Sequence, residues 1–211
     1  MTALIMKDLY AIKGQMKSAI YLLLFFMVLA FFFDMGPIVV MFAVLFGSLQ
    51  VMTSFAFDEM SKWDKYGLTL PVSRRKIIAS KYVLSLLLTI GSAVSLTPII
   101  LLFNLFFRSF STDELFSMLC VISAAALLML SVSIPIFLKF GTQKGRFFLF
   151  AVIFIPVFFT SFISENVARF SISLPSVQTL KLLAYGAPFF MLLPLMLSYL
   201  LSIKIYANKE F

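Results

Sequence analysis

Residues 58–81 read DEMSKWDKYGLTLPVSRRKIIASK and form the longest polar interval in an otherwise apolar chain. This interval holds six of the seventeen basic residues and the only tryptophan, Trp63. It is flanked by uncharged runs of the length that crosses about 30 Å of hydrocarbon as a helix. The interval therefore predicts a loop between membrane spans, and its charge predicts contact with another molecule.

The composition indicates an integral membrane protein. The 211 residues are 62% hydrophobic and 12% charged, and the mean hydropathy is +1.08, whereas soluble domains carry about 25% charged residues. We therefore predict an all-α membrane protein with one transmembrane domain over residues 1–211. The net charge of +8 does not indicate nucleic-acid binding, because loop lysines and arginines normally set the orientation of membrane proteins.

The apolar segments predict six spans, at residues 18–33, 35–57, 82–107, 115–138, 147–164 and 182–203. The first two form a run that is interrupted only by DMGP at residues 34–37, where glycine and proline predict a tight hairpin. As one helix, this run would be too long for a bilayer. The charge distribution below supports the hairpin independently.

Residues 1–17 predict a helix that lies on the membrane surface, with an ordinary cytoplasmic lead-in as the alternative. Its apolar side is formed by Ile5, Leu9, Ile12 and Met16 at helical spacing, while Lys13 and Lys17 reach the headgroups. On the other side of the membrane, residues 165–181 are either a short helix over an outer opening or a loop on the headgroups.

The basic residues predict the orientation. With six spans, one side of the membrane carries fourteen of them and the other carries only Arg108, Arg169 and Lys181. Because basic loops stay in the cytoplasm, we predict that both termini are cytoplasmic.

The sequence offers little for catalysis. It has no histidine, its one cysteine, Cys120, lies in an apolar run, and it has no GxxxxGK[ST] phosphate-binding loop. The spans lack the internal acids that ion-coupled carriers use. Their polar residues, among them Gln50 and Ser92, favour helix packing over substrate contact. We predict no enzyme activity, no metal and no cofactor bound to this chain.

The second half of the long loop predicts a short helix. Pro71 disfavours helix before it, Ser73 is a good N-cap, and residues 74–81 continue as a helix with Ile77 and Ile78 on its apolar side.

Three stretches then carry a family resemblance: ALIMKDLYAIKGQ at residues 3–15, FDEMSKWDKYGLTLPVSRRKIIASKY at residues 57–82, and IPIFLKFGTQKGR at residues 134–146. In these the chain resembles the small six-span permeases of type-2 ABC transporters, a group that includes exporters of phenol-soluble modulins and other bacterial peptides. The resemblance implies a half-transporter that pairs with a second copy or a close paralogue. It also implies a place in the bacterial plasma membrane and two separate ATPase subunits, which bind the ATP and Mg²⁺.

The resemblance further implies which residues meet the ATPase. A coupling helix in the loop maps onto Leu70, Pro71, Val72, Ser73, Arg74, Arg75, Lys76, Ile77 and Lys81, and a secondary contact maps onto Gly141, Lys144, Gly145 and Arg146. The expected function is export of amphipathic or hydrophobic peptides, with lipid-like or drug-like molecules next. The alternative is a membrane immunity or regulatory protein that binds peptide without transport. Membrane lipid is the remaining expected partner.

Overall fold

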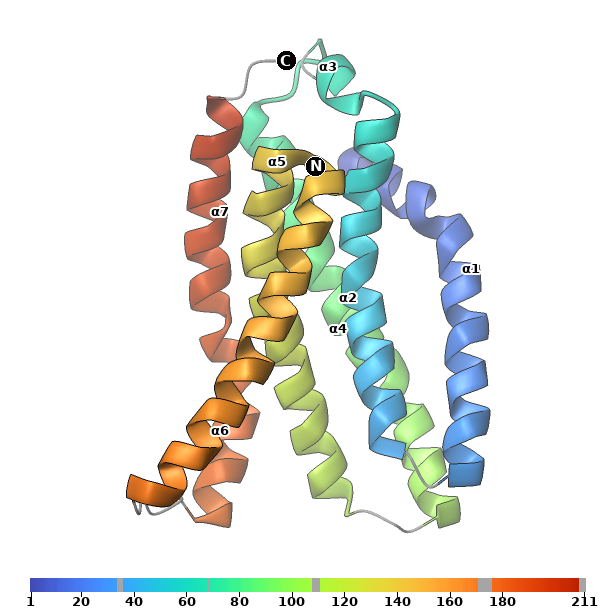
Figure 1. The fold of residues 1–211 in the computed structure, drawn as a ribbon. Helices are drawn as coiled ribbons and strands as arrows, with labels where there is room; N and C mark the ends of the chain where they lie inside the picture. The colour runs from blue at the N-terminus through green and yellow to red at the C-terminus, as the bar shows by residue number, and fades with distance from the viewer. Residues whose placement is uncertain (34–35, 68, 108–110, 171–175, 209–211) are drawn as a thin grey trace.

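A computed structural model describes residues 1–33, 36–67, 69–107, 111–170 and 176–208 (Figure 1). This part of the chain contains helices and no strands, which confirms the all-α class. The helices are α1 (Thr2–Phe33), α2 (Gly36–Met60), α3 (Trp63–Gly67), α4 (Arg74–Phe107), α5 (Thr112–Phe170), α6 (Val177–Phe190) and α7 (Leu192–Ala207).

Within the described residues, four helical stretches are long and apolar enough to cross a membrane. These stretches are Thr2–Leu29, Arg74–Pro98, Thr112–Phe148 and Gln178–Ala207. Many large apolar side chains on them are exposed, including Phe25, Val28 and Leu193, as expected for helices that face lipid. The number of six spans stays a prediction.

The first two predicted spans form a hairpin. Helix α1 ends at Phe33 and α2 begins at Gly36, and the two helices run side by side in opposite directions (Figure 1). Pro37 lies in the first turn of α2, where its missing N–H costs no hydrogen bond. The break predicted at residues 34–37 is thus confirmed, although residues 34 and 35 lie outside the described residues.

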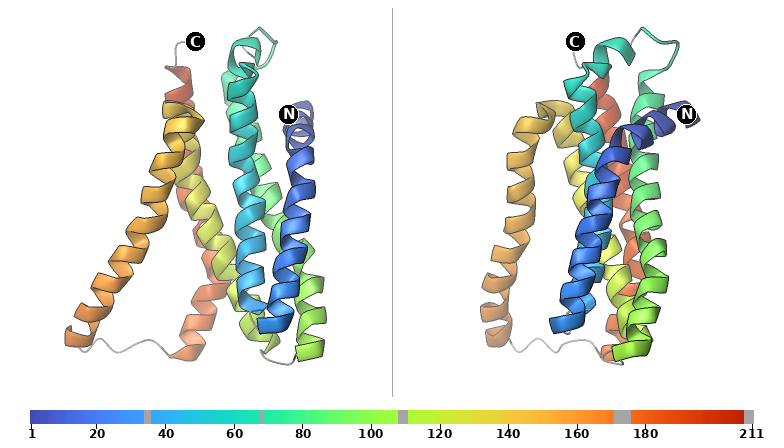
Figure 2. Two further views of the ribbon diagram at one scale, coloured as in Figure 1. Left: turned by 45° about the vertical axis from the view of Figure 1, so that its right-hand side comes forward. Right: turned by 90° about the vertical axis from the view of Figure 1, so that its right-hand side faces the viewer.

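The predicted boundary between residues 17 and 18 is not a break in the structure. Helix α1 is continuous from Thr2 to Phe33, and its first part bends away from the axis of the rest (Figure 2). Ile12, one of the residues predicted on the apolar side of a surface helix, is instead buried within the protein, and it shares the inward face with Asp8, one turn earlier. Lys13 and Lys17 are exposed. The placement of this first part on a membrane surface stays a prediction.

Helix α5 consists of two antiparallel halves that meet at Gly141 (Figure 1). Gly141 has φ 79° and ψ 172°, a conformation that favours glycine. The first half begins with a capping box, in which the Glu114 N–H donates to Ser111 Oγ and the Ser111 N–H donates to Glu114 Oε2, both at 3.2 Å. The predicted connection around residues 134–146 is therefore a single-residue reversal and not a loop.

The predicted outer segment at residues 165–181 is divided between two helices. Helix α5 continues to Phe170, and α6 begins at Val177 behind the N-cap Ser176, while residues 171–175 lie outside the described part. The described residues of this segment form no helix of their own.

The last predicted span, residues 182–203, is interrupted at Met191, where α6 ends and α7 begins. Pro188 lies inside α6 and Pro194 lies in the first turn of α7. A proline removes the backbone hydrogen bond to the residue four positions earlier and crowds that carbonyl group. Two prolines six residues apart therefore account for the break between them.

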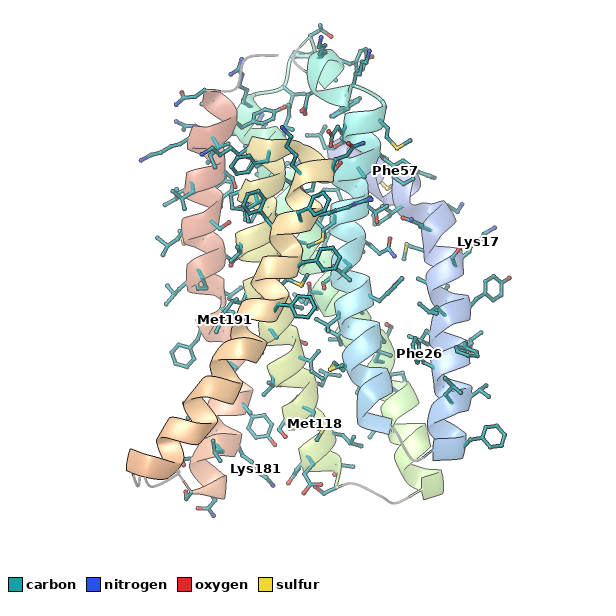
Figure 3. All side chains as sticks on the ribbon, viewed as in Figure 1. Lys17, Phe26, Phe57, Met118, Lys181 and Met191 are labelled. Atoms are coloured by element: carbon teal, nitrogen blue, oxygen red, sulfur yellow. The ribbon has the colours of Figure 1, made fainter. Side chains whose placement is uncertain are left out.

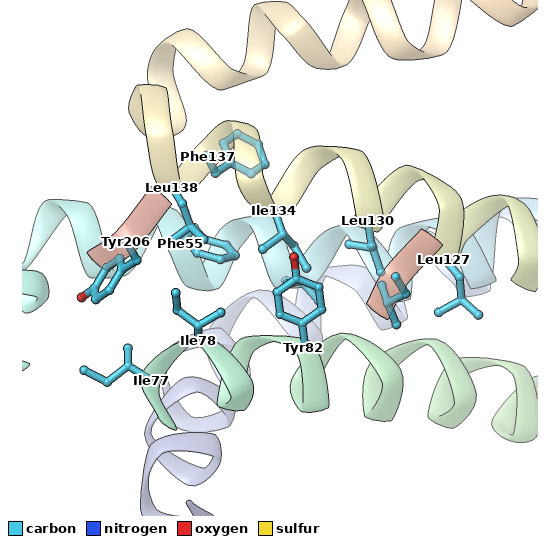
Figure 4. Packing of buried hydrophobic residues seen from close by; sticks show 12 residues of the cluster. Phe55, Ile77, Ile78, Tyr82, Leu127, Leu130, Ile134, Phe137, Leu138 and Tyr206 are labelled. Atoms are coloured by element: carbon cyan, nitrogen blue, oxygen red, sulfur yellow. The ribbon is translucent and has the colours of Figure 1, made fainter. Parts of the chain in front are cut away.

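The apolar core lies where α2, α4, α5 and α7 meet. Figure 4 shows Phe55 of α2, Ile78 and Tyr82 of α4, and Ile134 and Phe137 of α5 packed together. The Tyr82 hydroxyl forms hydrogen bonds with Ser198 Oγ at 2.6 Å and with Ser202 Oγ at 2.8 Å, and both serines belong to α7. Tyr82 therefore joins the apolar core to a polar contact between helices.

Helices α2 and α4 pack closely against each other at Gly47. A Cβ atom at this position would lie 2.6 Å from Ser92 Cβ. Small residues at such a crossing let two helix backbones pack tightly, as is common in membranes. Ser92 thus has the packing role that the sequence predicted for the polar residues of the spans.

Candidate functional site

The beginning of α4 lies at one end of the bundle, which we call the charged end. It is the end where α1 begins, α2 ends, α4 begins, α5 reverses at Gly141 and α7 ends (Figure 1). The Ser73 carbonyl accepts hydrogen bonds from the N–H groups of Lys76 at 2.9 Å and Ile77 at 3.3 Å. The predicted helix start at Arg74 is therefore present in the structure.

The predicted short helix is nevertheless part of a long one. Helix α4 continues without a break from Arg74 to Phe107, because its only proline, Pro98, comes seven turns later and no glycine precedes Gly91. The separate short helix of this loop is α3, which the sequence analysis did not predict. Lys62, with φ 51°, lies in the turn between the end of α2 at Met60 and the start of α3 at Trp63.

The predicted coupling residues fall into two groups. Pro71, Ser73, Arg74, Arg75 and Lys76 are exposed, and Leu70 and Val72 are partly exposed. Ile77 belongs to the apolar core, and Lys81 is 5% exposed. Of the predicted coupling residues, those at 70–76 are therefore the ones that are accessible at the surface.

Lys81 occupies the centre of a buried ionic cluster. Its Nζ atom donates to Asp8 Oδ1 at 2.9 Å and to Ser54 Oγ at 2.7 Å, and it forms an ion pair with Asp58 Oδ2. Asp8 is 1% exposed and Ser54 is 1% exposed. The cluster thereby joins α1, α2 and α4 through one cation.

Lys7 completes this cluster at its edge. Its Nζ atom lies 2.5 Å from Asp58 Oδ1, 3.0 Å from Asp8 Oδ1 and 4.1 Å from the centroid of the Trp63 ring. Each acid therefore contacts both lysines, and the four side chains have no net charge. A buried ion pair needs such mutual compensation, because removing charges from water is costly.

The sequence analysis did not identify this cluster. Asp8 was a detectable signal, since it interrupts the apolar face between Ile5 and Ile12 in a helix that was expected to lie on lipid. Lys81 and its partners Asp8, Ser54 and Asp58 come from three different helices, and only the packing of α1 against α2 and α4 brings them together.

Glu59 links the long loop to the reversal in α5. Its Oε2 atom accepts from the Thr142 N–H at 2.7 Å and from the Thr142 hydroxyl group. The carboxylate thus caps the first turn of the second half of α5, where free N–H groups favour a negative charge. A Cβ atom on Gly141 would lie 3.0 Å from Glu59 Oε1, so glycine also permits this approach.

Arg74 and Asp64 attach α7 to the same end. The Arg74 guanidinium donates to the carbonyl oxygens of Ala207 at 2.7 Å and Tyr206 at 3.4 Å, which are negative ends of the α7 dipole. The Tyr206 hydroxyl donates to Asp64 Oδ1 at 3.2 Å. Asp64 and Tyr206 line a cavity of about 100 Å³, together with Glu59 and Lys81.

The four residues predicted for the secondary contact also fall into two groups. Lys144 and Arg146 are exposed. Gly145 is buried, and a Cβ atom there would lie 2.4 Å from Phe137 Cδ1. Gly141 and Gly145 therefore shape the reversal, while Lys144 and Arg146 present charge beside it.

The apolar helices and the charged end together define a multi-pass membrane protein. The two loop motifs that carry the family resemblance, residues 57–82 and 134–146, contact each other through Glu59 and Thr142. The model of the ABC-2 family transporter protein matches residues 3–207. The chain belongs to this family, whose members are the membrane component of ABC transporters and not the catalytic one. The type-2 permease resemblance is thereby confirmed. No match is found among curated proteins or among solved structures.

Proposed function

We propose that this chain is the permease subunit of an ATP-driven exporter, and that its cargo is an amphipathic or hydrophobic peptide. Membership of the ABC-2 family supports a permease that works with an ABC ATPase. Export, the peptide cargo, two ATPase subunits and pairing with a second permease copy rest on the resemblance of the loop motifs. In this arrangement the charged end faces the cytoplasm, as its basic residues favour.

The observation that carries the proposal is the connection of the exposed segment 70–76 to the other helices. Arg74 donates a hydrogen bond to the end of α7. The helix that begins at Arg74 also contacts α1 and α2 through the ion pairs of Lys81 with Asp8 and Asp58. Glu59, at the end of α2, holds α5. A displacement of residues 70–76 by an ATPase would therefore move several helices together, which is how a docked element transmits rigid-body motion.

The ATPase contact is tested by charge reversal on the exposed segment. Arg75 and Lys76 are suitable because both are exposed, whereas Arg74 also holds α7. Arg75→Glu combined with Lys76→Glu should abolish co-purification with the ATPase subunit encoded nearby and should remove its stimulated ATP hydrolysis. The matched control is Lys13→Glu combined with Lys17→Glu, which makes the same change of charge on exposed positions of α1. If both pairs leave the complex intact, the assignment of residues 70–76 is wrong.

Transport and peptide sequestration are separated by a second experiment. Inside-out vesicles that contain this chain and its ATPase should accumulate a fluorescent amphipathic peptide when ATP is added. An ATPase variant that binds but does not hydrolyse ATP should stop this accumulation. A non-transporting immunity or regulatory protein would instead retain the same amount of peptide with either ATPase.

A further inference from the structure

Helix α3 lies at the tip of the charged end, beyond Phe57 of α2 (Figure 3). Its inner side is formed by Trp63, Asp64 and the buried Gly67, whereas Tyr66 is exposed. A Cβ atom on Gly67 would lie 3.4 Å from Trp63 Nε1, so the indole ring packs closely along this side. The short helix therefore has one side on the bundle and one side open.

Two neighbouring residues of α3 contact helices that lie on opposite sides of the bundle in Figure 1. The Trp63 ring lies 4.1 Å from Lys7 Nζ of α1, measured to the ring centroid. Asp64 Oδ1 accepts the hydrogen bond from the Tyr206 hydroxyl group of α7 at 3.2 Å. Helices α1 and α7 do not pack against each other within the described residues. Helix α3 thus forms a direct bridge between their charged ends.

A second connection between α1 and α7 runs through α4 and consists of buried groups. Lys81 pairs with Asp8 of α1, and Tyr82 pairs with Ser198 of α7, and all four residues are buried. Separating them would leave a charge or a hydroxyl group without its partner away from water, which is costly. The connection through α4 is therefore the rigid one.

The connection through α3 can open at lower cost. The side chain of Lys7 is 27% exposed, and it keeps its ion pairs with the two acids of the ionic cluster when the Trp63 ring leaves. A cation–π contact at such a site is weak compared with a buried ion pair. On the other side, Tyr206 lines the cavity of about 100 Å³, which is large enough for water to replace Asp64 as the partner of the hydroxyl group.

The chain on both sides of α3 is not helical. Lys62 lies in the turn before it, and the described residues 69–73 lie between it and the start of α4 at Arg74. This second connection overlaps with residues 70–76, the proposed ATPase contact. A partner that moves residues 70–76 therefore also moves α3.

We propose that α3 is a clamp across the charged ends of α1 and α7, and that it opens when the ATPase moves residues 70–76. Trp63 and Asp64 are its positioning residues, one for each helix. The proposal rests on the function proposed above and adds the residues that transmit the movement inside the permease. Because the two contacts act in series, the loss of either one opens the whole clamp.

The clamp is tested first on the purified full chain without an ATPase. Trp63 is the only tryptophan, so fluorotryptophan places a single fluorine label on α3. Tyr206→Phe removes the hydroxyl group at the α7 end and should shift the fluorine NMR resonance toward its position in Lys7→Gln, which lacks the cation at the α1 end. Tyr21→Phe, at an exposed position of α1, should leave the resonance unchanged. An unchanged resonance in Tyr206→Phe would overturn the proposal.

The second test uses the complex with the ATPase in vesicles, with ATP and a fluorescent amphipathic peptide. Trp63→Leu removes the ring from Lys7, whereas Trp63→Tyr keeps an aromatic ring there. Trp63→Leu should lower the peptide accumulated per ATP hydrolysed several-fold, with unchanged co-purification of the ATPase, and Trp63→Tyr should restore most of this loss. A purely structural role would lower co-purification and accumulation together.

The arrangement in series makes a further demand on this second test. Trp63→Leu combined with Tyr206→Phe should lose no more accumulation than Trp63→Leu alone. A larger loss in the double variant, or equal accumulation by Trp63→Leu and Trp63→Tyr, would overturn the clamp. If the unmodified chain accumulates no peptide with ATP, the function proposed above is wrong, whereas the fluorine measurement on the chain alone still decides whether α3 is a clamp.

Discussion

Lys81 Nζ lies 2.9 Å from Asp8 Oδ1, although 73 residues separate them in the sequence, and both side chains are buried. This contact joins the first turns of α1 to the start of α4, directly after the exposed segment 70–76. The ion pair therefore links the N-terminal part of α1 to the helix that begins within the proposed ATPase contact.

The first prediction concerns this ion pair. Lys81→Met should lower the free energy of unfolding by about 3–5 kcal/mol, because it leaves the buried acids Asp8 and Asp58 with less compensation. Denaturation of the purified chain in detergent measures this change. Lys76→Met, at an exposed position one turn earlier, should change the free energy by less than about 0.5 kcal/mol.

A double variant checks the interpretation of that first result. Asp8→Asn combined with Lys81→Met should be less destabilising than the sum of the two single changes, with a coupling of about 0.5–3 kcal/mol. Additive effects would show that the two side chains do not depend on each other.

The second prediction concerns the reversal in α5. Gly141→Ala should cost about 1–3 kcal/mol of unfolding free energy, because residues with a Cβ atom strongly disfavour φ 79° with ψ 172°. The approach of Glu59 Oε1 to the new Cβ atom adds to this cost. Gly14→Ala is the control. It lies in a helix with open space around it and should stabilise the chain by about 0.5–1 kcal/mol. Equal melting temperatures for the two variants would contradict the assigned reversal.

The third prediction concerns the crossing of α2 and α4. Gly47→Ala should destabilise the chain by about 1–3 kcal/mol, because the added methyl group would lie 2.6 Å from Ser92 Cβ and cannot be avoided by a side-chain rotation. Gly91→Ala, on the open side of α4, should not destabilise it. Thermal unfolding of both variants in the same detergent makes the comparison, and a neutral Gly47→Ala would mean that the helices are farther apart than the structure shows.

The fourth prediction concerns the contact between α4 and α7. Tyr82→Phe removes the hydroxyl group that pairs with Ser198 and Ser202, and hydrogen bonds between membrane helices contribute about 0.6–1.7 kcal/mol each. Loss of both hydrogen bonds should cost roughly 1–3 kcal/mol, together with faster hydrogen exchange of the α7 backbone. Tyr21→Phe, at an exposed position of α1, should leave both measurements unchanged.

Local signals in the sequence predicted much of the fold. Apolar runs between charges gave the all-helical membrane class, residues 34–37 gave the hairpin, and Ser73 after Pro71 gave the start of α4. Each depends on residues that are neighbours in the chain, so backbone chemistry and hydropathy are sufficient. The break at Met191 also has a local cause, because Pro188 and Pro194 lie on either side of it. It was not predicted because both prolines lie within one uninterrupted apolar run.

The candidate site was only partly predictable. The sequence by itself determined that a basic loop follows α2 and that its residues 74–76 lie at a helix start. It did not determine that Ile77 and Lys81 face inward, because the inward face of a helix depends on what packs against it. The tertiary structure alone brought Asp8 to Lys81 and Glu59 to Thr142. The physical reason is that charge pairing is a long-range contact that hydropathy and local spacing do not record, whereas a buried charge must find its partner wherever the packing of the helices places it.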